Sequence, residues 1–203
     1  MEIVAENVGK RYRRRFIFKK LNHRFEHNTC WAICGPNGSG KSTLLKILAG
    51  YTSPTQGKVK YSIEGKDVIE EDAVLRFSFV APYQEVIEEF TLGEMLDFHF
   101  QFRAPTAARA EMLERAQLTG SERKYIHEFS SGMKQRLKLI LAFYTEASCL
   151  FLDEPTSNLD DEGIKWYEQE MLSIKGNKNI IIASNQRYEY AFTNQILQVK
   201  DFL

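Results

Sequence analysis

The chain has 203 residues, of which 43% are hydrophobic and 27% charged, so we expect one globular domain, or one domain with a small inserted lobe. Lysine plus arginine and aspartate plus glutamate number 27 each, and this balance argues against a nucleic-acid partner. No apolar run approaches the roughly 20 residues of a membrane span, and the start MEIVAENVGKRY lacks the apolar core of a signal peptide. We therefore expect an intracellular protein that reaches a membrane only through another subunit.

The first thirty residues alternate weakly and predict short antiparallel strands with a turn near His27–Asn28. Within them, KRYRRRFIFKK at 10–20 carries seven basic residues in eleven. We expect an exposed hairpin with charged tips. Contact of these charges with nucleotide phosphates, acidic lipid or RNA is the alternative.

A glycine-rich motif follows the first buried run. CWAIC at 30–34 predicts a strand, and KSTLLKILAG predicts a helix that ends at Gly50. Between them GPNGSGKST fits G-x-x-x-x-G-K-[ST], whose backbone amides surround phosphate oxygens. Lys41 then reaches the β- and γ-phosphates, and the Ser42 hydroxyl binds Mg²⁺. The predicted nucleotide-binding residues are Gly35, Pro36, Asn37, Gly38, Ser39, Gly40, Lys41, Ser42 and Thr43.

The middle of the chain predicts two strands and a helical lobe. KVKYSIEG (58–65) alternates as an edge strand, and LRFSFVA (75–81) predicts another strand. Thr91 and Glu94 have capping-box spacing at the start of a helix. A second helix at 107–118 completes a small lobe, and Pro105 separates the two helices.

The last third alternates between strands and helices. Buried strands are predicted at 149–155, 179–184 and 194–199, with a helix at 161–172. This alternation implies an α/β core with a parallel sheet. Asp153 and Glu154 end the first of these strands. In a protein with such a phosphate loop, Asp153 holds Mg²⁺ and Glu154 accepts a proton from an attacking water. These features alone also fit a small nucleotide kinase.

Further motifs decide between these classes. Tyr12, Gln84 in APYQE, FSSGMKQR at 129–136 and SNLD at 157–160 occur in order around the glycine-rich loop and the CLFLDEP strand. Together they resemble the motifs of the ATP-binding-cassette (ABC) ATPases over essentially the whole chain. The SSG stretch ahead of the DEP strand is the most specific of them.

The resemblance implies a single ABC ATPase domain over 1–203. Its fold is a P-loop NTPase core in which helices flank a parallel sheet. An N-terminal antiparallel β subdomain would comprise about 1–30 and 57–70, and an inserted helical lobe about 88–128. The remainder would be a RecA-like core.

The resemblance also implies roles for residues outside the loop. Tyr12 would stack on adenine, Gln84 would sense Mg²⁺ and the attacking water, and Asp160 would run along a dimer seam. The stretch that contains Ser130 would face the γ-phosphate held by a second chain, where the serine and the helix-start amides would clamp it. The residues of that stretch are Ser130, Ser131, Gly132 and Met133.

Two positions depart from the family pattern. The usual LSGGQ is FSSGM here, in a form similar to exporter-type cassettes that are paired with separate membrane subunits. The family's histidine after the IIIAS strand is replaced by Asn185, which cannot become a cation. The loss of one such contact costs roughly a hundredfold in rate, so we expect slow hydrolysis with nucleotide binding intact. Arg187 could supply the missing charge.

These observations predict an ATP- and Mg²⁺-dependent ATPase subunit of an ABC transporter, more specifically an exporter. The expected partners are a second ABC ATPase subunit, identical or different, and a separate transmembrane permease subunit. The expected location is the cytoplasmic face of the cell membrane. Two alternatives are a soluble cassette ATPase that acts on ribosomes or DNA, and a regulatory nucleotide binder that scarcely hydrolyses ATP.

Overall fold

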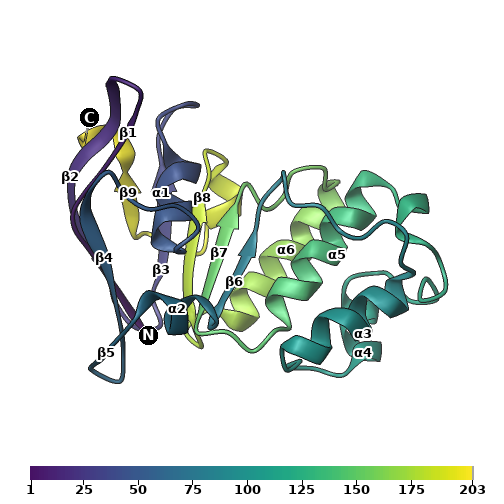
Figure 1. Ribbon diagram of the computed structural model, residues 1–203. Helices are drawn as coiled ribbons and strands as arrows, with labels where there is room; N and C mark the ends of the chain where they lie inside the picture. Colours follow the sequence, from purple (N-terminus) through teal and green to yellow (C-terminus); the bar gives the residue numbers. More distant parts are fainter. Residues whose placement is uncertain (203) are drawn as a thin grey trace. The chain divides into compact units, whose positions relative to one another are not determined.

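The computed structural model describes residues 1–202, which form strands and helices in two sheets and a group of helices (Figure 1). The strands are β1 Glu2–Tyr12, β2 Arg15–Phe25, β3 Cys30–Cys34, β4 Gln56–Ile63, β5 Lys66–Val68, β6 Phe77–Val80, β7 Cys149–Asp153, β8 Asn179–Ala183 and β9 Ile196–Gln198. The α-helices are α1 Lys41–Leu48, α2 Glu70–Val74, α3 Leu92–Phe102, α4 Arg109–Arg115, α5 Ser131–Phe143 and α6 Asp161–Ile174. Three short 3₁₀ helices are η1 Ile126–Glu128, η2 Arg187–Tyr190 and η3 Val199–Phe202.

The first sheet has four strands in the order β2-β1-β4-β5, and its neighbours pair antiparallel. The hairpin of β1 and β2 confirms the expected antiparallel start of the chain. The expectation that 58–65 forms an edge strand is wrong, because β5 lies outside it. Glu64 (φ 51°) and Gly65 (φ 77°) form a two-residue turn, and positive φ at both positions turns the chain back so that β5 pairs with β4.

The second sheet has five strands in the order β6-β7-β8-β3-β9. The pairs β7–β8, β3–β8 and β3–β9 are parallel, as the alternation of strands and helices predicted. Every residue of β7 and β8 is buried, which explains why both strands are continuous apolar runs. The carboxyl end of β7 places Asp153, and β3 leads into the glycine-rich loop.

The chain divides into two compact units. The first contains Met1–Phe79, Ala147–Glu154 and the C-terminal segment from Ile174. In this unit one hydrophobic core joins the two sheets through helix α1, whose Leu44, Leu45 and Leu48 are fully buried within it. The core therefore fixes the position of α1, the helix that follows the glycine-rich loop.

The second unit contains Val80–Glu146 and Pro155–Ser173, and it is built from helices α3 to α6. The predicted capping box begins α3, since Glu94 N donates to Thr91 Oγ1 at 3.2 Å and Thr91 N donates to Glu94 Oε2 at 2.7 Å. Helix α4 is shorter than the predicted 107–118, and α2 was not expected at all. Among residues 1–202, no helix is long and apolar enough to cross a membrane.

A buried carboxylate joins three elements of the second unit. Glu170 of α6 is only 2% exposed. Its Oε1 accepts from Arg115 Nε of α4 at 2.8 Å, and its Oε2 accepts from Tyr144 OH, after α5, at 2.9 Å. Burial and this carboxylate raise the pKa of Tyr144, so the phenol remains a donor. The contacts fix α4, α5 and α6 to one another.

Candidate functional site

The glycine-rich loop connects β3 to α1 inside the first unit. Gly40 occupies the N-cap position of α1 at φ 99°, which favours glycine. A Cβ on Gly40 would lie 2.3 Å from Ile17 Cγ2, so a side chain here would also collide with β2. Neither the N-cap residue nor the first turn places a side-chain acceptor over the amides of α1. Such a helix start favours an anion.

Lys41 begins α1 and its side chain is largely buried. Its Nζ donates to the carbonyl of Gly35 at 2.8 Å and to that of Pro36 at 3.4 Å. The ammonium group of Lys41 is therefore hydrogen-bonded to the beginning of the glycine-rich loop. This contact holds a fixed positive charge at the loop.

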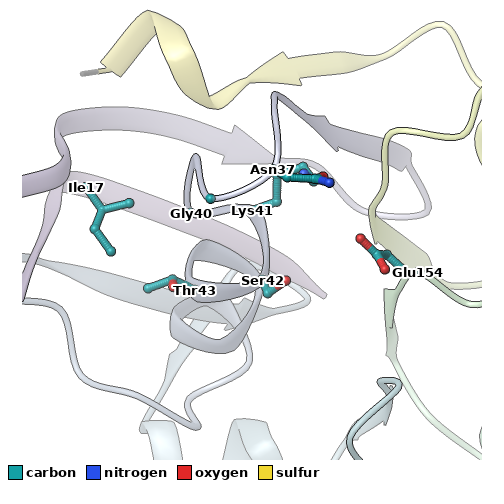
Figure 2. Close-up of a pocket in the computed structure, with 8 residues that line it drawn as sticks. Ile17, Asn37, Gly40, Lys41, Ser42, Thr43 and Glu154 are labelled. Carbon is teal, nitrogen blue, oxygen red and sulfur yellow. The ribbon is translucent and has the colours of Figure 1, made fainter.

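A cavity of about 310 Å³ opens beside the loop (Figure 2). Its lining residues are Ile17, Asn37, Gly38, Gly40, Lys41, Ser42, Thr43 and Glu154. Within the loop, the Oγ of Ser39 is buried and has no hydrogen-bond partner among the described residues. An orphaned buried hydroxyl in a loop of amides is the kind of group that a phosphate oxygen satisfies.

Ser42 and Asp153 meet at the carboxyl end of β7. The Ser42 hydroxyl donates to Asp153 Oδ1 at 2.9 Å, although the two residues are 111 positions apart in the sequence. Burial raises the pKa of Asp153, while this hydrogen bond and the charges of Lys46 and Lys41 act in the opposite direction. A hydroxyl and a carboxylate side by side are oxygen ligands of the type that Mg²⁺ prefers. The two residues thus fit the group that the sequence implies.

Glu154 has an unusual backbone. Its φ is 45°, a left-handed conformation that costs free energy in a non-glycine residue. Its amide donates to the carbonyl of Ala183 on β8 at 3.0 Å, which holds the residue in this conformation. The carboxylate lies across the cavity from Ile17 (Figure 2). Backbone strain of this kind is common at functional sites, and the predicted role of Glu154 stays a prediction.

Asn185 follows β8 and contacts the glycine-rich loop. Its Nδ2 donates to Asn37 Oδ1 at 2.9 Å, and Asn37 lines the cavity. The suggestion that Arg187 supplies the missing positive charge has no support in the geometry. The Arg187 guanidinium donates to the carbonyl of Thr193 at 3.3 Å and lies 5.0 Å from the ring centre of Tyr190.

Tyr12 lies at the end of β1, paired with Arg15 across the hairpin, and it is 53% exposed. The Nζ of Lys10 lies 5.3 Å from its ring centre and also donates to the carbonyl of Ser53 at 2.7 Å. The hairpin residue that lines the cavity is instead Ile17, which the sequence reasoning missed. Its only signal was its place in the apolar FIF run among the basic residues.

In the second unit, the SSG stretch forms the start of α5. The Ser130 Oγ accepts from Met133 N at 3.2 Å, so Ser130 is the N-cap of α5. A Cβ on Gly132 would lie 3.1 Å from the carbonyl oxygen of Asn158, so a larger residue there would crowd that carbonyl. Ser131 is exposed and meets no such restriction, which explains why FSSGM tolerates a serine at that position.

The other predicted residues of the second unit each accept a hydrogen bond from a backbone amide nearby in the sequence. The Oε1 of Gln84 accepts from Ala81 N at 2.9 Å and closes a turn. The Oδ1 of Asp160 accepts from Gly163 N at 2.8 Å in the first turn of α6. The roles of both residues toward a ligand stay predictions.

Comparison with known proteins decides the family. The family model of the ABC transporter matches residues 18–157, a span that begins in β2 and includes the glycine-rich loop, the start of α5 and the end of β7. The chain belongs to the ABC transporter family. The resemblance that the motifs indicated is therefore confirmed.

Relatives of this ABC family member include transport proteins. The daunorubicin resistance ATP-binding protein DrrA3 of Streptomyces coeruleorubidus is 31% identical over 93% of this chain. The Nod factor export ATP-binding protein I of Burkholderia orbicola is 32% identical over 88% of it. In both cases the match spans only 61% of the relative's own length.

Solved structures agree on the fold. A dimeric structure of a post-hydrolysis state of the ATP-binding cassette MJ0796, bound to ADP and Pi, superposes with a TM-score of 0.81. The match covers 97% of this chain and 93% of that chain at 21% identity. The α/β fold of the ABC cassette is thereby confirmed for this chain.

Proposed function

We propose that this chain is the ATP-binding and ATP-hydrolysing subunit of an ABC transporter, with ATP and Mg²⁺ as substrate and cofactor. The observation that carries the proposal is the arrangement around one cavity of the first unit. Lys41 is buried there, and the buried Ser39 hydroxyl has no hydrogen-bond partner among the described residues. Glu154 has a strained backbone, and Ser42 is hydrogen-bonded to Asp153 in the same unit. This combination suits a triphosphate with a divalent cation.

Each group has a distinct task in this proposal. The amides of the loop and Lys41 bind the phosphates, and Lys41 exchanges its contact with the Gly35 carbonyl for phosphate oxygens. Ser42 and Asp153 would hold Mg²⁺, which neutralises negative charge on the phosphates when it is bound. Glu154 takes a proton from the attacking water. Gln84 keeps the role that the family resemblance implies, toward Mg²⁺ and the attacking water.

Turnover in this proposal is slow. The side chain of Asn185 ends in a neutral amide, and this amide donates a hydrogen bond to Asn37 of the loop. An amide can orient a neighbouring group but cannot place a positive charge on the transferred phosphoryl group. Binding is unaffected because the phosphate-binding residues are present. Asn185 is thus a weak substitute for the histidine that the family pattern has here.

The dimer that the proposal requires forms between this chain and a second ATPase subunit, which is identical or different. In the dimer, Ser130 and the amides of Ser131 and Gly132 contact the γ-phosphate that the partner binds. The Ser130 Oγ is used as a helix cap, but its proton remains free to be donated to a phosphate oxygen. Met133 adds no polar group. Tyr12 stacks on adenine.

The membrane partner is a separate transmembrane permease subunit, which this chain would bind at the cytoplasmic face of the membrane. The names of the relatives, which include a drug-resistance protein and a Nod factor export protein, support an exporter. In the second unit, Phe90, Phe98 and Phe102 form a row of edge-to-face rings, and Phe102 is 71% exposed. Exposed aromatic residues of this kind suit the anchor points of a protein interface.

The catalytic part of the proposal is tested by Glu154→Gln, which keeps the shape of the side chain and removes the base. We expect steady-state ATP turnover to fall by about a hundredfold, because general-base catalysis contributes that much. The dissociation constant of a fluorescent ATP analogue should remain within about twofold. A matched control is Glu64→Gln, because Glu64 belongs to the same unit and also has a positive φ of 51°.

Two outcomes would reject this part of the proposal. Equal turnover in wild type and Glu154→Gln would show that Glu154 is not the base. Failure of the wild-type chain to bind ATP with Mg²⁺ would reject the nucleotide site itself. The permease is tested separately, by recovery of a membrane protein with the tagged chain and its loss when Phe98 and Phe102 are both replaced by serine.

A further inference from the structure

Two consecutive residues of α5, Gln135 and Arg136, contact the segment 155–160, which connects β7 to α6. Gln135 is buried and its Nε2 donates to the carbonyl of Pro155 at 2.6 Å. Arg136 is 7% exposed, and its Nη2 lies 3.5 Å from Asp160 Oδ1. One helix turn earlier, Gly132 lies against the carbonyl of Asn158. Helix α5 thus contacts this segment at its beginning, middle and end.

The guanidinium of Arg136 joins two helix ends of opposite polarity. Its Nη1 donates to the carbonyl of Ala116, the C-cap residue of α4, at 3.2 Å. The carbonyl end of a helix favours a cation. On the other side, Asp160 accepts from the Gly163 amide at the amino end of α6, where an anion is favoured.

An arginine is required for this arrangement. The guanidinium face lies 5.4 Å from the ring centre of Trp166, a buried residue of α6. A planar guanidinium group can stack on the indole while its two terminal nitrogens donate to separate acceptors. A lysine ammonium has one nitrogen and cannot stack in this way. The side chain of Asp160 is 74% exposed, so it has little packing of its own to hold it.

We propose that Arg136 is a positioning residue that, together with Gln135, fixes the segment 155–160 to the helix that begins at Ser130. The conformation of Asp160 then follows α4 and α5 as they move together. The proposal rests on the proposed function in one respect, because the segment matters for turnover only if Asp160 contacts a second subunit.

Arg136→Lys in the full-length chain tests the proposal. We expect amide hydrogen exchange in 155–164 to rise about tenfold, while exchange in α1 is unchanged. In steady-state assays, kcat should fall by about fivefold to tenfold with KM for ATP within about twofold, because Arg136 does not line the cavity at the glycine-rich loop. The matched control is Arg115→Lys, which weakens the contact with buried Glu170 in the same unit. It should lower the Tm but change neither exchange in 155–164 nor kcat.

A second variant covers the case in which Arg136→Lys does not fold. Asp160→Asn keeps a good N-cap for α6 but removes the charge that faces Arg136, so exchange in 155–164 should again rise. Unchanged exchange in these variants, or an equal rise in Arg115→Lys, overturns the proposal. If wild type shows no turnover, the proposed function fails, and the exchange comparison still decides the role of Arg136.

Discussion

The two units of this protein present their predicted functional residues in different ways. In the first unit, Lys41, Ser42 and Asp153 are arranged by contacts among themselves and with the glycine-rich loop. In the second unit, Ser130 and Asp160 both serve as helix caps, with their oxygens bonded to nearby amides. The first unit holds a site prepared for a ligand, and the second holds residues that first stabilise their own helices.

This difference predicts which measured property a substitution in each unit should change. Changes to the phosphate-binding residues of the first unit should alter nucleotide binding directly, because these groups are fixed there before a ligand arrives. Changes in the second unit should leave nucleotide affinity intact and alter stability or turnover. Four variants test or sharpen this distinction, and they are described from the largest expected effect to the smallest.

Lys41→Ala should have the largest effect. It removes the buried cation at the phosphate loop, so we expect ATP turnover to fall more than about a hundredfold. The dissociation constant for ATP should rise at least about tenfold, as measured by titration with a fluorescent analogue. Lys19→Ala, at an exposed position of β2 in the same unit, is the control. Unchanged affinity in Lys41→Ala would remove the basis for calling the first unit a prepared site.

Arg115→Ala should destabilise the second unit without weakening the nucleotide site. It leaves the buried carboxylate of Glu170 without its cation, which we expect to cost about 2 kcal/mol, since Arg115 itself is partly exposed. Chemical denaturation would then show about a thirtyfold change in the unfolding equilibrium. Arg109→Ala breaks an exposed pair with Asp97 and should change stability by less than about 0.5 kcal/mol. A large change in ATP affinity for Arg115→Ala would contradict the separation of the two roles.

Asn185→His should raise turnover by about tenfold, because a histidine adds a positive charge that the amide lacks. The affinity for ATP should not change, since the phosphate loop is intact. Steady-state phosphate release measures the effect, and Asn177→His, in an exposed turn of the same unit, is the control. Equal turnover in wild type and Asn185→His would mean that Asn185 does not limit the rate.

The smallest effect concerns pH. Burial and the nearby charge of Arg103 lower the pKa of His99 below its ordinary value of 6.5, and its Nε2 lies 2.7 Å from Thr145 Oγ1. The unfolded chain therefore binds more protons in the window just below 6.5, so stability should decrease as the pH falls through that window. His99→Gln cannot titrate and should flatten the dependence measured by denaturation between about pH 7 and about pH 5. An identical dependence in the variant would assign the effect to other groups.

Much of the first unit could be predicted because its signals are local. CWAIC and the loop after it are contiguous, and strand β3 and helix α1 lie where the pattern placed them. The start of α5 at Ser130 is equally local, because an N-cap is determined by a few neighbouring residues. The alternation of strands and helices indicated the parallel sheet for the same reason.

Other features depended on distant partners. The position of β4 inside its sheet follows from the short strand β5, and Ile17 reaches the cavity only because β2 passes Gly40. The contacts of Arg136 join residues from α4 and α6 to α5, which no spacing along one helix reveals. Asn185 could be recognised as a departure from the family pattern, but its contact with Asn37 could not.

The most direct test of the account is whether a bound triphosphate joins two chains. Glu154→Gln should be examined by analytical ultracentrifugation with saturating ATP and Mg²⁺, and again with Ser130→Arg added, which obstructs the start of α5. The account predicts a dimer with ATP, none without nucleotide, and loss of the dimer in the double variant although ATP still binds. A chain that binds ATP and remains monomeric at high concentration would contradict a pair of identical subunits, and a dimer that is indifferent to Ser130→Arg would contradict the account itself.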